Sequence, residues 1–470
     1  MNIPILVITI GGVRAGILFQ YAPEGMVPTQ QFCADEIYAA LPFAQGPVLS
    51  ELMRAQDPEQ QRATWLDYTH PVFNGAIGAK GDKLLPAFFQ NLLPEGVFRN
   101  HVAQEAQIDP RDHIAMLAAC GNDLPGNVRA QWQDISRDTL QKLITQNHDA
   151  LEMTVWAEPF QDAIAISGVQ PKLAVNQDAE GRFVGRTRLG DTSIIAKLPT
   201  PDRPRMPQVE DLSMRMARAA GVNTCSFSLE PLARLTAPHA YDLADEVQGD
   251  FLAVRRFDRT PAGRVHFEDF AQVLGVQPDN KNASSYAEIA ATLLDLKGCG
   301  VDAVHELIRR IMVNDLIGNA DMHLKNLGLL YPDGKTATLA PAYDVVAYGA
   351  FQTIAGHALA LIDEHSRQAH NPRDPLLSPK LLQTFCNLLN IQIRPASAVV
   401  RETVDKAIRA WSEMIQTSGL TARQKRLLLT RVHQHPHVQS ALKRRKALAV
   451  VWEAAQIAVD AADLQFLKAP

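Results

Sequence analysis

The chain has 470 residues, of which 46% are hydrophobic and 21% are charged. This length and composition are typical of a globular protein with two to four domains or lobes. The formal net charge of −5 argues against a protein that coats nucleic acid by bulk positive charge. The five cysteines are scattered without a CxxC pair, which excludes a cysteine zinc frame and is typical of a reducing cytoplasm.

The first ten residues are apolar, but they lack a basic n-region and break at Gly11 and Gly12 before Arg14. We therefore expect a strand and a turn there rather than a signal peptide. No window approaches 18 uninterrupted apolar residues, so the sequence predicts no membrane span and a cytoplasmic location.

Residues 1–130 alternate short strand-like runs with turn residues and then become helical. Within them, residues 84–99 gather apolar side chains around two prolines, which predicts a buried element that ends in a turn. Residues 121–126 (GNDLPG) are a tight turn by composition, and we interpret them as a plain connector. Residues 131–160 are polar and helix-leaning, and we expect a linker there.

Residues 163–175 read AIAISGVQPKLAV, in which extended apolar residues flank a Ser-Gly turn. The run continues past a second turn at residues 176–181 into β-like sequence, which predicts a hairpin. Such a loop can lay backbone N–H groups over phosphates. It is neither GxGxxG nor Walker A, because it has one glycine and Lys172 is followed by leucine; a plain hairpin is the alternative.

Residues 193–198 (SIIAKL) predict a strand whose Lys197 must reach water or find an anion. Residues 208–220 then have apolar side chains at helical spacing and stop at Gly221, with Glu210 near the start. A strand lysine paired with a helix glutamate is the device by which kinases hold the α- and β-phosphates. The alternative is an edge-strand lysine at the surface.

Residues 251–257 (FLAVRRF) predict a strand, and residues 254–257 are a candidate hinge whose backbone would contact adenine. From Phe267 onward the long runs are helical, and residues 302–316 form an amphipathic pattern that stops at Gly318. Strands followed by helices indicate a small β lobe and a large α lobe.

Residues 316–347 hold the polar landmarks Asp321, Asn326 and Asp344. An aspartate followed five positions later by an asparagine has the spacing of the kinase catalytic loop, in which the aspartate deprotonates the acceptor hydroxyl and the asparagine holds magnesium. Asp344 would then be the second metal ligand. The alternative is that Asp321 and Asn326 only cap and turn the chain after Gly318.

Together these stretches resemble the HipA-like serine/threonine kinases of bacterial toxin–antitoxin modules. The motifs that carry the resemblance are FFQNLLPEG (88–96), GNDLPG (121–126), ISGVQPKLAV (166–175), IIAKLP (194–199), VEDLSMRMARAAG (209–221), VRRFDR (254–259), HFEDFAQVLG (266–275), DLIGNADMHLKNLGLLY (315–331) and LAPAYDV (339–345). The resemblance implies an α+β, protein-kinase-like two-lobed fold. Its parts would be an N-terminal subdomain (1–130), a β-rich small lobe with the Gly-rich loop (131–255) and an all-α large lobe (256–470).

The resemblance also implies the roles of individual residues. Asp321 becomes the catalytic base, Lys325 neutralises charge on the transferred phosphoryl, and Asn326 and Asp344 hold Mg²⁺. His323 belongs to the same motif, and we interpret it as a structural hydrogen-bonder. The residues implied to contact ATP are Ser167, Gly168, Val169, Gln170, Lys172, Lys197, Glu210, Arg255, Phe257, His323, Asn326 and Asp344.

The chain departs from the family pattern at two positions. Arg255 stands where relatives often carry an acidic residue, and Ala165 stands where many have a serine that becomes autophosphorylated. Ser167 is the only hydroxyl between Ala163 and Lys172, which makes it the candidate autophosphorylation site, with negative charge then repelling nucleotide. The alternative is that Ser167 only caps the turn.

By resemblance the protein is a toxin that phosphorylates a protein substrate, in the family often an aminoacyl-tRNA synthetase, and so arrests translation. A helix-turn-helix antitoxin would restrain it and would be its only link to DNA. Two alternatives are a catalytically idle co-repressor that works through that antitoxin and a small-molecule kinase on the same fold.

Residues 423–446 concentrate basic residues around three histidines. They are either a face for nucleic acid or antitoxin, or solvated helix faces around a proline-broken loop; the apolar Leu427, Leu428 and Leu429 favour the second interpretation. The histidines lack metal-site spacing, so we expect no zinc there.

Overall fold

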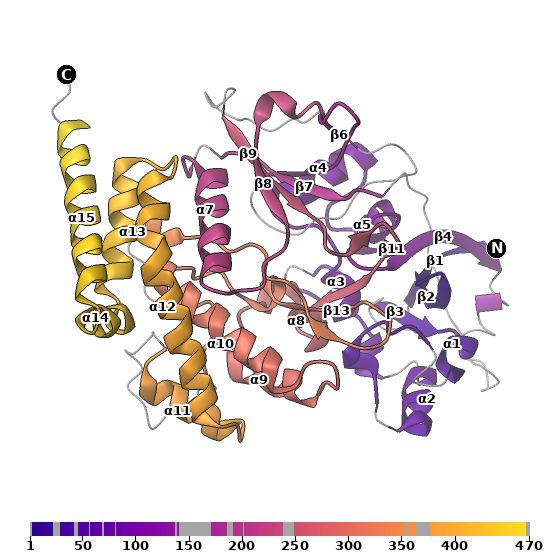
Figure 1. The fold of residues 1–470 in the computed structure, drawn as a ribbon. Helices are drawn as coiled ribbons and strands as arrows, with labels where there is room; N and C mark the ends of the chain where they lie inside the picture. Colours follow the sequence, from indigo (N-terminus) through magenta and orange to yellow (C-terminus); the bar gives the residue numbers. More distant parts are fainter. Residues whose placement is uncertain are drawn as a thin grey trace.

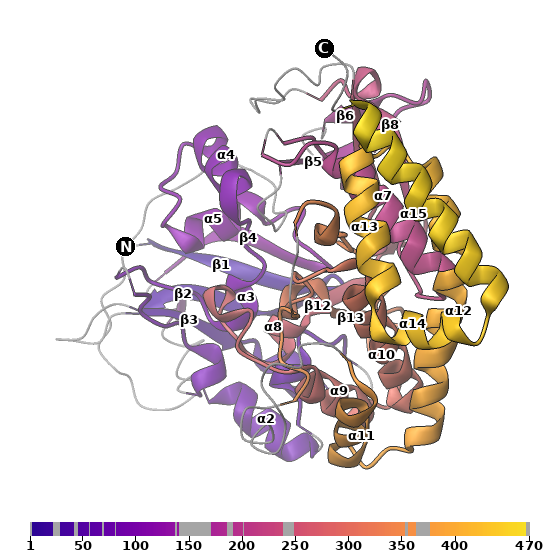
Figure 2. The same ribbon diagram turned by 90° about the vertical axis from the view of Figure 1, so that its left-hand side faces the viewer.

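The computed structural model describes residues 2–21, 29–41, 46–55, 57–67, 70–79, 81–136, 139–140, 171–185, 191–200, 202–237, 249–352, 356–362 and 377–466. Figures 1 and 2 show the N-terminal part, in indigo and purple, on the opposite side of the molecule from the C-terminal helices, in orange and yellow. The predicted loop at residues 167–170 and the departure at Ala165 lie outside the described residues.

Residues 2–136, here called the N-terminal unit, form an antiparallel four-stranded sheet in the order β3-β2-β1-β4. Strand β1 is apolar on both faces: Leu6 and Ile8 enter the core with the helices, whereas Ile5 packs on the opposite face with Ile17. The elements are β1 Asn2–Ile10, β2 Val13–Tyr21, β3 Thr29–Ala34, α1 Glu36–Ala40, α2 Pro58–Leu66, α3 Ala87–Gln90, α4 Gly96–Ala106, α5 His113–Cys120 and β4 Val128–Ser136. Helix α3 buries Phe88 and Phe89, which confirms the predicted buried element.

Strand β4 overturns part of the expected linker. Residues 131–136 are not helix-leaning chain but the second half of this strand, paired with β1 from Val7 to Asn2. Val128 and Ala130 pack into the core with the helices, Ile135 is buried on the opposite face with Ile5 and Ile17, and Gln131 and Gln133 are exposed. A polar composition is compatible with a helix, but a strand at the edge of a sheet, as β4 is, has the same composition.

The five-stranded antiparallel sheet that follows, here called the small-lobe sheet, has the order β6-β5-β7-β9-β8. Its strands are β5 Lys172–Gln177, β6 Phe183–Gly185, β7 Ile194–Lys197, β8 Phe227–Pro231 and β9 Asp250–Arg255. The β5–β6 pair, with its turn at residues 178–181, confirms the predicted hairpin. The strand expected before Ser167 lies outside the described residues.

Helix α7 (Met206–Ala219) lies between the small-lobe sheet and the large-lobe helices. Val209, Leu212 and Met216 share one core with Leu252 of β9 and with the helices beyond. Trp411 Nε1 donates a hydrogen bond of 2.9 Å to the Met216 carbonyl. The helix ends before Gly221, whose φ of 98° suits glycine, so the predicted helix and its stop are confirmed.

The remaining chain is mostly helical, with short strands that the expected all-α lobe omitted. Three of these strands form an antiparallel sheet in the order β12-β13-β14. The elements are β10 Arg259–Thr260, β11 Gly263–Arg264, β12 His266–Asp269, α8 Phe270–Val273, α9 Tyr286–Asp295, α10 Gly300–Ile317, β13 Gly328–Tyr331, β14 Thr338–Leu339, α11 Pro379–Leu388, α12 Ile393–Thr417, α13 Ala422–Gln434, α14 Pro436–Lys443 and α15 Lys446–Phe466. Helix α10 ends at Gly318 in the left-handed region, as predicted.

The basic C-terminal stretch is helical almost throughout. Pro436 opens α14 as its first residue, and the His435 side chain accepts the His437 N–H, so no proline-broken loop exists there. Leu428 and Leu429 are buried, which confirms the expected packing. Among the described helices, none is both long and apolar enough to cross a membrane.

Candidate active site

Two lysines stand opposite each other on neighbouring strands of the small-lobe sheet. Lys172 begins β5, Lys197 ends β7, and the two are direct register partners. Side chains alternate across a strand, so both lie on the face that carries Ala174 and Ile195, which pack against the core of the N-terminal unit. Lys197 is on the central strand and only 6% exposed, so the alternative of an edge-strand surface lysine is wrong.

The Lys197 ammonium contacts two carboxylates at once. Its Nζ lies 2.5 Å from Oε1 of Glu210 on α7 and 2.5 Å from Oδ1 of Asp344. Burial alone would lower the pKa of Lys197, but the two carboxylates outweigh it and raise the pKa above its usual value. The expected strand-lysine and helix-glutamate pair is thus present, with Asp344 as a third member.

Glu210 is completely buried near the start of α7. Burial raises the pKa of its carboxyl to about 7 against the opposing pull of Lys197. Its second oxygen, Oε2, is buried and has no hydrogen-bond partner among the described residues. Helix α7 is fixed to the segment after Asp344, because Ser213 Oγ accepts a 2.8 Å hydrogen bond from the Ala347 N–H.

Asp344 has a left-handed backbone, with φ of 57°, which is uncommon for a residue with a side chain. Burial would raise the pKa of its carboxyl, but Lys197 and Lys172 lower it well below its usual range. The preceding Tyr343 donates a 2.8 Å hydrogen bond from its hydroxyl to the Lys325 carbonyl. That bond ties the Asp344 segment to residues 319–326, here called the catalytic loop.

Of the four predicted site residues in the catalytic loop, only Asp321 has an exposed side chain. The Asp321 carboxylate is 46% exposed, while His323, Lys325 and Asn326 are buried. Its backbone N–H bonds Asn319 Oδ1 at 3.0 Å, and its carbonyl accepts Asn326 Nδ2 at 2.7 Å. Burial first, and then repulsion from Asp344, raises the pKa of Asp321. A backbone-tethered, accessible carboxylate of raised pKa is suited to accept a proton.

Two hard oxygen donors come together next to Asp321. Asn326 and Asp344 line one narrow cavity with Asn319 and Met322. With Asn326 Nδ2 committed to the Asp321 carbonyl, the amide oxygen is the atom left to ligate a cation. An amide and a carboxylate oxygen are ligands that Mg²⁺ accepts in proteins, so the residues present fit this ion.

His323 has a structural setting within the catalytic loop. Burial lowers the pKa of its imidazole to about 4, so the ring is neutral at physiological pH. Its Nε2 lies 3.7 Å from Asp321 Oδ1, and its carbonyl accepts the Asn326 N–H at 2.9 Å. The ring nitrogen Nδ1 is buried without a hydrogen-bond partner among the described residues.

Lys325 does not face the site, contrary to the role expected for it. Its Nζ lies 3.0 Å from the Asn91 carbonyl, 3.2 Å from Asn91 Oδ1 and 3.0 Å from Glu95 Oε1. The ammonium thus donates two hydrogen bonds to Asn91 and forms an ion pair with Glu95, so its contacts are made with the N-terminal unit. The assignment of Lys325 to the transferred phosphoryl is therefore wrong in this structure.

The candidate hinge also differs from the expectation. The Arg255 N–H bonds the Ser226 carbonyl at 2.8 Å and the Arg256 N–H bonds the Ser193 carbonyl at 2.9 Å, so neither is open to adenine. The Arg255 side chain is exposed. Phe257 packs against Phe267 and Tyr343 at ring-centroid distances of 5.2 and 5.6 Å. The expected backbone contact to adenine is therefore not available at the Arg255 and Arg256 N–H groups, and a contact at Phe257 stays a prediction.

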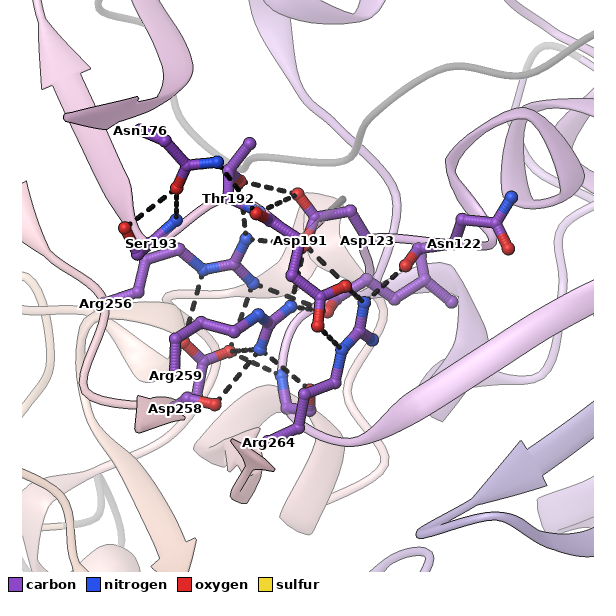
Figure 3. Close-up of polar contacts among 12 residues, drawn as sticks. Asn122, Asp123, Asn176, Asp191, Thr192, Ser193, Arg256, Asp258, Arg259 and Arg264 are labelled. Atoms are coloured by element: carbon purple, nitrogen blue, oxygen red, sulfur yellow. Dashed lines mark hydrogen bonds and ion pairs between the residues drawn. The ribbon is translucent and has the colours of Figure 1, made fainter. Parts of the chain in front are cut away.

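Figure 3 shows a buried polar network that sequence reasoning missed. Asp123 of the GNDLPG turn accepts hydrogen bonds from Arg256 at 2.9 Å, Arg259 at 2.8 Å and the Thr192 hydroxyl at 2.5 Å. Asp258 pairs with the same two arginines, and Asp191 pairs with Arg264. The turn is therefore no plain connector. It joins the N-terminal unit to the end of the small-lobe sheet, and the arginine-rich VRRFDR run was its only sequence signal.

Comparison with known proteins supports one family for most of the chain. Residues 164–411 match the family model described as the HipA-like C-terminal domain, and residues 7–131 match the HipA N-terminal domain. A solved structure titled as the HipA–HipB–operator DNA complex of the Shewanella oneidensis MR-1 toxin–antitoxin system aligns with a TM-score of 0.60 and 19% identity. It covers 92% of this chain and 97% of that chain. The alignment confirms the predicted α+β, two-lobed fold.

Two curated relatives of Sinorhizobium fredii (strain NBRC 101917 / NGR234) have similar sequences. The protein named "Putative kinase Y4dM" is 36% identical over 270 residues, which are 56% of this chain and 62% of that protein. The protein named "Putative kinase Y4mE" is 25% identical over 349 residues, which are 68% of this chain and 79% of that protein. The chain thus spans a little under two thirds of the length of the first of them.

Proposed function

This chain belongs to the HipA-like family, and from that premise we propose that it is an ATP- and Mg²⁺-dependent kinase that phosphorylates a protein serine or threonine. The observation that carries the proposal is the single Lys197 ammonium held between Glu210 and Asp344 beside the accessible Asp321. Phosphoryl transfer needs such positioned charges and little other covalent work from the protein.

The charges of the site suit a triphosphate. Lys172 and Lys197 supply positive charge on one face of the small-lobe sheet. When Lys197 moves from Asp344 to the phosphates, Glu210 still holds it, and Asp344 becomes available with Asn326 to hold Mg²⁺. Bound Mg²⁺ would neutralise charge on the β- and γ-phosphates.

Asp321 supplies the proton acceptor. As the substrate hydroxyl oxygen bonds to the γ-phosphorus, Asp321 accepts the hydroxyl proton, and the bond from the γ-phosphorus to the bridging oxygen breaks to release ADP. The raised pKa of Asp321 strengthens it as a base relative to an ordinary surface carboxylate.

The biological setting is proposed from the family. The protein acts in the cytoplasm as the toxin of a toxin–antitoxin module, with a helix-turn-helix antitoxin as partner and contact to DNA through that antitoxin. The structural relative, titled as a complex of HipA, HipB and operator DNA, supports this arrangement. The substrate in this proposal is a protein of translation, such as an aminoacyl-tRNA synthetase.

Incubation of the purified chain with [γ-³²P]ATP, Mg²⁺ and cell lysate tests the class of acceptor. One labelled protein band whose label is on serine or threonine supports the proposal. A labelled metabolite would identify a small-molecule kinase instead. Absence of any labelled product, with binding to a DNA-bound antitoxin retained, would identify an idle co-repressor.

A further inference from the structure

The FFQNLLPEG segment, residues 88–96 of the N-terminal unit, lies against the catalytic loop and its neighbours. Asn91 is buried and makes three hydrogen bonds to the large lobe and one within its own unit. Its carbonyl and Oδ1 accept Lys325 Nζ, while its Nδ2 donates to the Val276 carbonyl at 2.8 Å and to the Ala87 carbonyl at 2.9 Å. The Phe88 carbonyl accepts Gln272 Nε2 at 3.1 Å. The segment is therefore bonded to the large lobe at several points.

Glu95, at the end of the same segment, lies between two lysines. Its Oε1 is 3.0 Å from Lys325 Nζ, and its Oε2 is 3.9 Å from Lys281 Nζ. Burial would raise the pKa of its carboxyl, but these lysines lower it, so Glu95 is a carboxylate at neutral pH. One negative charge thus pairs with two cations, Lys325 within the catalytic loop and Lys281 outside it.

Lys281 connects this contact to the reacting carboxylate. Its carbonyl accepts the Leu324 N–H of the catalytic loop at 3.2 Å. Its side chain is 28% exposed, and its positive charge acts on both Asp321 and His323. Lys281 is therefore the more accessible of the two lysines, because the Lys325 side chain is only 2% exposed.

We propose that residues 88–96 are a positioning element for the catalytic loop: Asn91 and Glu95 anchor Lys325, and Glu95 holds Lys281 as the cation beside Asp321 that faces the phosphoryl group in transfer. The inference rests on the proposed kinase function for its chemistry, but the contacts it invokes exist without nucleotide. It gives the N-terminal unit a direct part in setting the geometry of the reaction.

Hydrogen exchange of the full chain tests the anchoring without any activity. In Glu95→Gln, the amides of Leu324 and Asn326 should exchange about tenfold faster than in the wild type, while α12 amides stay unchanged. Glu105→Gln, the same change at an exposed carboxylate on α4, is the matched control and should leave all these amides unchanged. Unchanged exchange of residues 321–327 in Glu95→Gln would overturn the proposal.

A combination of variants tests whether Glu95 acts through the two lysines or independently of them. If Glu95 acts through Lys325 and Lys281, adding Glu95→Gln to a variant that carries both Lys325→Met and Lys281→Met should change loop exchange little further, because both contacts of Glu95 are already removed. Additive effects on loop exchange would overturn the proposal.

The kinetic consequence separates this inference from the proposed function. With the labelled acceptor as substrate, Glu95→Gln should lower kcat about tenfold and leave KM for ATP unchanged, because Lys197 and Asp344 are untouched. Equal kcat in wild type and variant would contradict it. A wild type without phosphoryl transfer would instead refute the proposed function, and the exchange data would still decide the anchoring.

Discussion

Nζ of Lys197 lies 2.5 Å from Oδ1 of Asp344, the residue that is expected to hold magnesium. The same nitrogen also holds Glu210 at 2.5 Å, so one ammonium balances two buried carboxylates. A magnesium nucleotide would take over both ends of the Lys197–Asp344 contact, with phosphate at the lysine and metal at the aspartate. Without nucleotide, Lys197 and Asp344 therefore neutralise each other, as phosphate and Mg²⁺ would neutralise them in the complex.

Lys197→Met should destabilise the fold as well as abolish phosphoryl transfer. Removing one partner of a buried pair typically costs about 3–5 kcal/mol, because the remaining charges stay uncompensated. Without the lysine, the folded-state pKa values of Glu210 and Asp344 should rise. Protonation of these carboxyls then stabilises the folded variant at low pH, and this stabilisation is lost as the pH rises. The loss of unfolding free energy should therefore be smaller at pH 5 than at pH 7.5. Urea unfolding at both pH values measures it.

Lys406→Met is the matched control for this variant, since Lys406 is exposed on α12 and pairs with the exposed Glu402. Its unfolding free energy should stay within about 0.5 kcal/mol of wild type. Equal stability of the Lys197 and Lys406 variants would show that the buried pair does not exist in solution.

Binding of Mg·ADP should weaken above pH 8. Burial first, and then repulsion from Lys197, lowers the pKa of Lys172 to about 8, so this lysine loses its positive charge within an accessible pH range. Calorimetric titration between pH 7 and 9.5 measures the affinity. Lys172→Arg, which stays charged, should flatten the profile, and an identical decline in that variant would assign the pH dependence to another group.

Asp123→Asn should weaken the attachment of the N-terminal unit. Asp123 is fully buried and accepts from both Arg256 and Arg259, so its loss leaves uncompensated positive charge in the network. We expect a loss of about 3–5 kcal/mol in the free energy of unfolding by urea. Asp134→Asn, at an exposed position of β4, provides the comparison. A similar result for both variants would contradict the structural role of the turn.

The motif elements were predictable because each depends on local sequence. Helix α7 follows from apolar residues at helical spacing with Gly221 as its stop, and α10 follows in the same way with Gly318. Lys197 was marked by a charge inside an apolar strand. These signals need no knowledge of what lies across the fold.

The partners of buried charges were not predictable from one sequence. Asp123 and Arg256 are 133 positions apart, and Lys325 and Asn91 are 234 positions apart. A polar residue in a turn looks the same whether it faces water or a buried arginine. The resemblance placed Lys325 in the catalytic motif but gave no direction for its side chain, so the contact with the N-terminal unit was missed.

Glu268→Gln should remove a pH dependence of stability. Glu268 is fully buried, and its carboxyl accepts from Ser50, the Glu51 N–H and the Tyr331 hydroxyl. Burial raises its pKa from 4.5 to about 8. A raised folded-state pKa contributes stability that is present below pH 4.5 and is lost as pH rises through 8.

The stability of wild type relative to the glutamine variant should therefore fall between pH 5 and 8, by at most about 1.4 kcal/mol per pH unit. Urea unfolding of both proteins across this range makes the measurement. Parallel stability curves would mean that Glu268 does not titrate in this range.

The central claim, that Asp321 and the Lys197 cluster transfer a phosphoryl group, is tested most directly by which phosphate of ATP moves. The wild type and Asp321→Asn are each incubated with Mg²⁺ and lysate, once with [γ-³²P]ATP and once with [α-³²P]ATP. The account predicts that only the γ label reaches the acceptor and that Asp321→Asn reduces its transfer by about 10²–10⁴-fold, the usual contribution of a general base. Transfer of the α label, or undiminished γ transfer by Asp321→Asn, would contradict it.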